Sequence, residues 1–460
     1  MREIVARHSF LTVAALAWST ALPAQLTLAG ALRTADRDAY ANRVASAAAN
    51  TANARRRTPL RGVLPSVRFE GGYLRTTDPI GAFGTRLKQR EIAQSDFDPG
   101  RLNYPTAIGN YTAGVVVEQP LLNADSWLGR RAAGYGDSRG QSAAEWTRLS
   151  TLVDVIRAYY GAVLATERLT TLNAAAEAAQ AHLRQADAMV RAGMATKSDA
   201  LLAAVKAGDV EAERIEARSD ATTARRQLAV MIGLGASAEP AVPARLPPVA
   251  SIQQLAATDA VDLPSRPRAD VDAARSGVGA ARTNLQRARS LYLPRLNAFA
   301  RYDWNSPQHA YGGEKSWTVG VLASWSPFDG ASQSAEAQLA SAGLELATAD
   351  ADAASDQARL ETQRSLASLQ AALARLDIAE RAVAQSIEAH RIVTRKYEGG
   401  LATVVELLDA ATVETQSNLA LSHAQFIAIT AVADRRRASG LDPGTLTSLD
   451  AAPAITAEHQ

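Results

Sequence analysis

A long internal repeat constrains the fold of this chain more than any other feature of its sequence. The segment GMAT at 193–196 recurs as GLAT at 400–403, 207 residues later, and TAGV at 112–115 recurs as TVGV at 318–321, 206 residues later. LPSV at 64–67 recurs as LPRL at 293–296 after 229 residues, so the first copy is expected to have a loop about 23 residues longer, at about 76–111. A nearly constant offset predicts two copies of one structural unit.

The repeat divides the chain into five segments. Residues 1–29 combine Arg2 and Arg7 with an apolar run at 10–18 and small residues at 21, 24 and 29, which is typical of a secretory signal peptide. The first repeat is expected at 30–235 and the second at 267–440, with a proline-rich connector at 236–266 between them and a tail at 441–460. Ala31 stands where a lipoprotein signal would need cysteine, so we expect no acylation there.

Each repeat contains two segments with the alternation typical of β-strands. They are expected at about 64–75 and 111–121 in the first copy, and at about 294–304 and 317–326 in the second. Apolar and polar residues alternate along 295–304 except at Phe299. Of the 24 aromatic residues, 15 lie in 69–127 or 292–328, around these strands. Strands of 9–11 residues flanked by aromatic side chains are typical of membrane-crossing strands; a small β-domain with an aromatic core is the alternative.

The rest of each repeat is predicted to be helical, with one helix before the strands and a long helical hairpin after them. The hairpins are expected at 137–233 and 331–438, where alanine-rich sequence carries apolar residues spaced three and four apart. One such series contains Leu149, Leu152, Ile156, Tyr159 and Val163. This spacing is typical of an antiparallel coiled coil, and glycines at 193 and 399–400 are suited to ending the long helices. The expected fold is therefore mainly α with a small β part.

Four strands cannot close a membrane barrel, because the smallest single-chain barrels have eight. An open sheet edge in lipid would leave backbone groups without hydrogen bonds, so the barrel is expected to be shared between chains. Two chains would supply eight strands and three chains would supply twelve, and both numbers are permitted. Side chains fill the interior of an eight-stranded barrel, so a role in transport favours at least three chains.

The ordered motifs of both copies resemble those of the TolC-like outer-membrane factors. The resemblance covers about 31–440 and rests on the repeat, the LPRL entry to a strand at 293–296, RPRADV at 266–271 and, above all, YEGGLATVVELLDA at 397–410. It implies a homotrimer with a 12-stranded β-barrel in the lipid of the Gram-negative outer membrane and an α-helical tunnel in the periplasm. Such channels are exit ducts of tripartite efflux pumps or type I secretion systems. Their partners are a periplasmic adaptor (membrane fusion protein) and an inner-membrane transporter of the RND, MFS or ABC type.

The resemblance also implies roles for the hairpin turns. In the family these turns form the periplasmic aperture, and the matching acids here are Asp199, Glu406 and Asp409. The alternative is that these acids simply favour the first turn of a helix. Ala402 and Thr403 stand where some relatives have a basic residue that could lock the closed state, and Lys197 is a candidate substitute. The residues expected to contact an adaptor are Gly193, Thr196, Lys197, Ser198, Gly399, Gly400, Ala402 and Thr403.

Other functions have little support in the sequence. The formal net charge of +2 gives no basis for nucleic acid as a partner, and the absence of cysteine excludes disulfides and cysteine-based zinc sites. The six histidines include no pair three or four residues apart, so no helical metal site is expected. We therefore expect no cofactor, no metal and no enzymatic activity. The remaining alternative is a periplasmic coiled-coil adaptor or a structural envelope protein without a pore.

Overall fold

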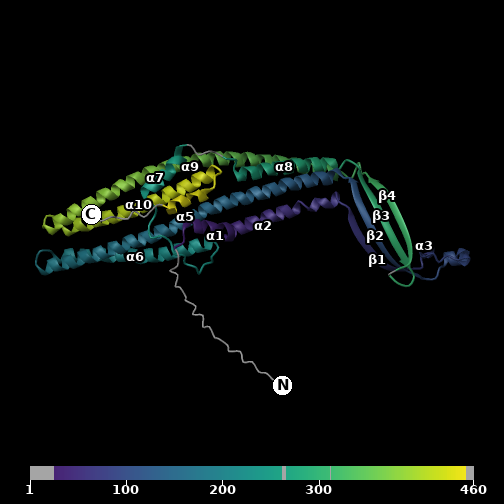
Figure 1. Ribbon diagram of the computed structural model, residues 1–460, viewed down its shortest axis with the longest axis horizontal. Helices are drawn as coiled ribbons and strands as arrows, with labels where there is room; N and C mark the ends of the chain where they lie inside the picture. The colour runs from purple at the N-terminus through teal and green to yellow at the C-terminus, as the bar shows by residue number, and fades with distance from the viewer. Residues whose placement is uncertain (1–24, 262–265, 311, 452–460) are drawn as a thin grey trace, which may run out of the picture.

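The computed structural model describes residues 25–261, 266–310 and 312–451, and its long helices lead from a pair of hairpin turns to a sheet near the opposite end (Figure 1). The first repeat comprises α2 (Tyr40–Arg55), β1 (Ser66–Thr76), β2 (Ile108–Leu122), α5 (Ala124–Arg191) and α6 (Lys197–Met231). The second comprises α8 (Ala269–Ser290), β3 (Arg295–Ser306), β4 (Glu314–Ser324), α9 (Ser332–Glu398) and α10 (Val404–Ala438). The matching order of elements confirms the predicted two-repeat fold.

The long helices pack along the series of apolar residues that the sequence indicated. Leu149, Leu152, Ile156, Tyr159 and Val163 of α5 are all buried. All of them except Leu149 belong to a central core that also contains Leu369 of α9 and Ile429 of α10. Helix α5 begins at Ala124, 13 residues before the expected start at 137, and continues directly from β2. Among the described helices, none is both long enough and apolar enough to cross a membrane.

Two segments expected to be irregular contribute to this core. The connector contains α7 (Val249–Val261), and the tail contains a 3-10 helix, η3 (Pro443–Ala451). Ile252 of α7 and Leu446 of η3 are fully buried in the core. Apolar side chains that enter the core stabilise short helices that are marginal on their own.

The described N-terminal residues are also packed. Helix α1 (Leu28–Asp38) begins with Leu28, which is fully buried. The Leu26 N–H donates to the Ala241 carbonyl oxygen (2.7 Å), and the Tyr159 hydroxyl donates to the Leu26 carbonyl oxygen (2.9 Å). Most of the predicted signal peptide, residues 1–24, lies outside the described residues. Residues 26–28, at its predicted end, are part of the packed structure.

The four strands form one antiparallel sheet in the order β1-β2-β3-β4. Residues paired across the sheet lie on the same face, so Phe69, Val115, Tyr302 and Trp317 form one apolar row. The opposite face is polar and carries ion pairs of Arg68 with Glu70 (3.5 Å) and of Arg301 with Asp303 (2.8 Å). Strands β1 and β4 are the edges of the sheet in the described part of the chain.

Phe299, which broke the alternation of β3, has a structural reason for its position. It pairs with Gly320 of β4, and a Cβ atom on that glycine would lie 2.9 Å from the Phe299 ring carbons Cε1 and Cζ. The ring therefore covers the surface that a side chain would otherwise fill.

A cluster of charged side chains around Trp146 joins the two repeats near the middle of the molecule. The guanidinium carbons of Arg268 and Arg437 lie 4.5 Å and 5.0 Å from the centroid of the Trp146 ring. Glu361 of α9 pairs with both arginines, and its contact with Arg268 measures 2.7 Å. These residues come from α5, α9, α10 and the residue before α8, so the cluster holds four segments together. We call it the Trp146 cluster.

Candidate functional site

The two hairpin turns have the same construction, which follows from their sequences. Gly193 and Gly400 adopt positive φ angles of +76° and +73°, which favour glycine, and thereby end α5 and α9. The residue after each glycine donates its N–H back into the helix, from Met194 to the Met189 carbonyl oxygen and from Leu401 to the Lys396 carbonyl oxygen (both 2.8 Å). This pattern is the Schellman motif.

A threonine begins the second helix of each hairpin, and an acid completes its cap. The Thr196 N–H donates to Asp199 Oδ2 (2.9 Å), while the Asp199 N–H donates to the Thr196 hydroxyl (3.3 Å). The Thr403 N–H donates to Glu406 Oε2 (2.6 Å), and the Glu406 N–H donates to the Thr403 hydroxyl (3.3 Å). Each pair is a capping box. Asp199 and Glu406 therefore have a structural role whatever else they do.

These hydrogen bonds also determine the charge of the two acids. Bonds from the backbone and hydroxyl of Thr196 lower the pKa of Asp199. The same bonds from Thr403 lower the pKa of Glu406, and the charge of Lys396 lowers it further. Both carboxylates are therefore negative at neutral pH. Among the described residues, Lys197 forms no ion pair, so the cation that acts on Glu406 is Lys396.

Asp409 differs from the other two predicted acids. It is exposed, and it forms no hydrogen bond or ion pair with another described residue. Its counterpart 207 residues earlier is Leu202, so this charge belongs to the second repeat alone. No such contact of its side chain with another described residue is therefore present to give Asp409 a capping role.

The ends of the helices that flank the two turns pack against each other. Ala186 and Ala203 of the first hairpin form a small apolar cluster with Tyr397, Val404 and Leu407 of the second. The Tyr397 hydroxyl donates to the Met189 sulfur (3.1 Å). Burial raises the pKa of Tyr397, and the charge of Asp199 raises it further. The structure thus brings together the helix ends that flank the turns at 193–198 and 399–403.

The outer surface of the turns is apolar as well as charged. Met194 and Leu401 occupy equivalent positions and are 72% and 82% exposed. Of the predicted contact residues, Gly193, Thr196, Lys197, Ser198, Gly399, Gly400 and Thr403 are exposed, and Ala402 is half-buried. Exposed apolar side chains beside polar ones are typical of a protein-binding surface.

Sequence reasoning missed a histidine pair between the two hairpins. His182 of α5 and His390 of α9 have ring centroids 6.2 Å apart, and His390 Nδ1 lies 2.5 Å from Glu414 Oε2 of α10. A search for histidines three or four residues apart could not detect this pair. The signal that could have found it is the repeat, because the two positions are 208 residues apart. The described residues contain no group of three or more histidine, aspartate or glutamate side chains arranged to hold a metal ion.

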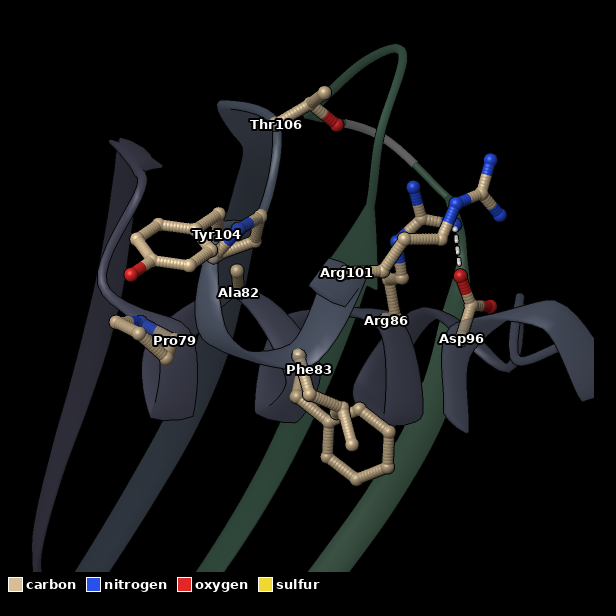
Figure 2. Close-up of a pocket in the computed structure, with 10 residues that line it drawn as sticks. Pro79, Ala82, Phe83, Arg86, Asp96, Arg101, Tyr104 and Thr106 are labelled. Atoms are coloured by element: carbon tan, nitrogen blue, oxygen red, sulfur yellow. Dashed lines mark ion pairs between the residues drawn. The ribbon is translucent and has the colours of Figure 1, made fainter. Parts of the chain in front are cut away.

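At the opposite end of the molecule, the long loop of the first repeat folds into α3 (Pro79–Gln89), η2 (Gln94–Phe97) and α4 (Pro99–Asn103). These elements surround a cavity of about 100 Å³, with Phe83, Tyr104 and the ion pair of Arg86 with Asp96 (3.4 Å) around it (Figure 2). Gln89 Nε2 donates to Asn110 Oδ1 (2.9 Å) and so fixes α3 to the beginning of β2. The cavity is smaller than typical ligand pockets, so the hairpin turns remain the candidate site.

Comparison with known families agrees with this architecture. Residues 43–234 and 266–441, which span both repeats, match the family described as outer membrane efflux protein. The chain belongs to the outer membrane efflux protein family. The predicted family resemblance is therefore confirmed.

Solved structures show the same fold. The outer membrane channel CmeC of Campylobacter jejuni has a TM-score of 0.74 and 16% identity, over 98% of this chain and 96% of that chain. The outer membrane protein VceC of Vibrio cholerae has a TM-score of 0.73 and 19% identity, over 90% of this chain and 96% of that chain. The open-state outer membrane channel MtrE of Neisseria gonorrhoeae has a TM-score of 0.72 and 18% identity, over 91% of this chain and 90% of that chain. No curated protein matches the chain.

Proposed function

We propose that this chain forms the trimeric exit duct of a tripartite efflux or type I secretion system. In this proposal it lies in the Gram-negative outer membrane, extends into the periplasm and passes solutes from an inner-membrane transporter and its periplasmic adaptor to the outside. The observation that carries the proposal is the match of both repeats to the outer membrane efflux protein family.

The sheet supports a barrel shared between chains. Its apolar face includes Phe69, Trp317 and Val321, all exposed in the single chain. Lipid would cover these side chains, while the face that carries Arg68 and Arg301 would line the lumen. The edges β1 and β4 need partners in lipid, and neighbouring chains can supply them. Twelve strands from three chains would leave an open lumen.

The helices support the same assembly. Leu339, Leu346 and Ile378 of α9 and Ile215 of α6 are large apolar side chains that are exposed in the single chain. Contacts between subunits would bury such residues and supply the burial that an isolated chain lacks. The helical hairpins of three chains would then surround a tunnel.

The turns support a role at the periplasmic entrance. Three copies of Asp199, Glu406 and Asp409 around a threefold axis would favour cations over anions. The exposed Met194 and Leu401 would bind apolar side chains of the adaptor, and the surrounding polar residues would set its orientation.

The central test is conduction by the purified protein. We expect an outer-membrane fraction to contain a trimer whose mobility changes on heating, and the trimer to conduct ions in planar bilayers. A monomer that stays in the soluble periplasmic fraction and gives no conductance would contradict the proposal. The alternative of an adaptor without a pore predicts that outcome.

A further inference from the structure

The histidine pair borders a cavity that lies between the two hairpins. This cavity has a volume of about 970 Å³ and is lined by residues of α5, α6, α9 and α10. His182, His390 and Glu414 are on its wall. The three side chains thus connect the first hairpin to both helices of the second, between the Trp146 cluster and the turns.

The hydrogen bonding of His390 leaves one ring nitrogen without a partner. An ionised carboxylate only accepts hydrogen bonds, so Nδ1 carries the proton that is donated to Glu414 Oε2 (2.5 Å). Nε2 is buried and has no hydrogen-bond partner among the described residues. With the proton on Nδ1, Nε2 is a buried acceptor without a donor, in a ring that lies against His182.

The surroundings of His182 disfavour the protonated, positively charged form of its ring. Burial lowers the pKa of His182, and the neighbouring His390 lowers it further. The other charged groups on the cavity wall are Glu167 of α5, Lys206, Asp209 and Glu213 of α6, and Arg245 of the connector. No ion pair joins any of these groups to His182 in the described structure.

We propose that His182, His390 and Glu414 form a proton-sensitive latch that holds the two hairpins together at neutral pH and releases them when the pH falls. At neutral pH the rings pack edge to face, at an interplanar angle of 69°. A proton on His182 would place a positive charge in a partly buried site, 6.2 Å from the His390 ring and with no ion-pair partner among the described residues, which disfavours the packed arrangement of α5 and α9.

The direction of the effect follows from linkage. A histidine whose pKa is lower in the packed state than in the open state binds fewer protons when packed. The packed state therefore has its full stability above about pH 6.5, the ordinary pKa of histidine, and loses stability as the pH falls below it. The link to transport rests on the proposed function, because separated hairpins open a tunnel only if the chain is a channel.

Hydrogen exchange of the full trimer tests the latch directly. In the wild type we expect protection of segments 176–190 and 386–398 to fall severalfold more between pH 7.5 and 5.5 than the intrinsic rates explain, because the pKa of His182 is lower in the packed state. His182→Gln, which cannot be protonated, should remove most of this change, and His390→Gln provides a second variant if the first is unstable. The matched control is His423→Gln, an exposed histidine on α10, which should behave like the wild type.

The outcomes separate the latch from the proposed function. Protection that does not depend on pH in the wild type, or an equal response in His182→Gln and His423→Gln, would overturn the latch. Conductance in planar bilayers at pH 7.5 is measured in parallel and tests the channel itself. A trimer that conducts at pH 7.5 and becomes more conductive at pH 5.5, except in His182→Gln, would support both proposals.

Discussion

Asp199 and Glu406 stabilise helix ends with the same carboxylates that would give the turns their charge. Because hydrogen bonds lower the pKa of both groups, the caps keep their full strength above about pH 4, the ordinary pKa of carboxyls, and lose it as the pH falls through the lowered values. Replacement of Glu406 by alanine would remove a charge and half of a capping box together. A test of the charge alone must keep the cap.

Glutamine at position 406 makes that test possible, because glutamine also completes a capping box. We expect the double variant Glu406→Gln and Asp409→Asn to reduce the cation preference of the channel, measured as the reversal potential in a salt gradient, by about twofold or more. Glu345→Gln, an exposed acid on α9 far from the turns, is the matched control. An unchanged reversal potential in the double variant would mean that neither acid contributes to cation preference.

Among the elements, the turns and the strands were the easiest to predict and the helix starts the hardest. Glycine followed by an N-cap threonine determines where each turn lies, because few residues adopt a positive φ angle. The start of α5 was misplaced because 124–136 contains three glycines and lacks the spacing of the later coiled coil. The LPRL motif at 293–296 predicted the start of β3 within one residue.

Cross-linking from the turns tests their predicted contact with an adaptor. Because the chain has no cysteine, Met194→Cys and Leu401→Cys each introduce one thiol, to which a photoreactive group can be attached. We expect both variants to cross-link the adaptor in cells. Ile80→Cys on α3, 85% exposed at the opposite end of the molecule, should not. Adaptor cross-links from position 80 and none from the turns would contradict the prediction.

The pairing of Phe299 with Gly320 makes a prediction for the sheet. Gly320→Ala should destabilise the trimer by about 1–3 kcal/mol, because the added Cβ displaces the Phe299 ring. In a Phe299→Ala background the same change should cost little, which a double-mutant cycle in thermal unfolding would detect. Gly71→Ala in β1 is the control, since its nearest contact is an ordinary 3.7 Å. Equal costs of Gly320→Ala in both backgrounds would exclude the proposed role of the ring.

At the scale of the whole molecule, the sequence predicted the repeat and the family but not the contacts between the repeats. The heptad spacing of α5 could be read because it is local, and its residues are buried as expected. The pairing of His182 with His390, and of Arg268 and Arg437 with Trp146, depends on how two hairpins lie side by side. No local pattern encodes that arrangement. Helix α7 was not predicted, because the prolines of the connector are typical of irregular segments.

The packing of the N-terminus makes a prediction about processing. Because Leu28 is buried and Leu26 forms backbone hydrogen bonds, cleavage after residue 29 would remove part of the fold. We therefore predict that the signal peptidase cuts before Leu26, with Ala24 as a suitable small residue at the cleavage site. Intact mass and N-terminal sequencing of the purified protein would check this. A mature chain that begins at Gly30 would show that the contacts of Leu26 and Leu28 are dispensable.

A small rotation of helix α5 at the Trp146 cluster would become a larger displacement at the hairpin turn. From Trp146 to Arg191 helix α5 extends about 68 Å at 1.5 Å per residue. A rotation of about 3° at the cluster would therefore displace the turn by about 3.5 Å, roughly the width of a methyl group, if the helix moves as a rigid rod. Because residues 152–163 of α5 lie in the central core between the cluster and the turn, such a rotation would have to move the core as well, so the packing of the core and the position of the turn are coupled.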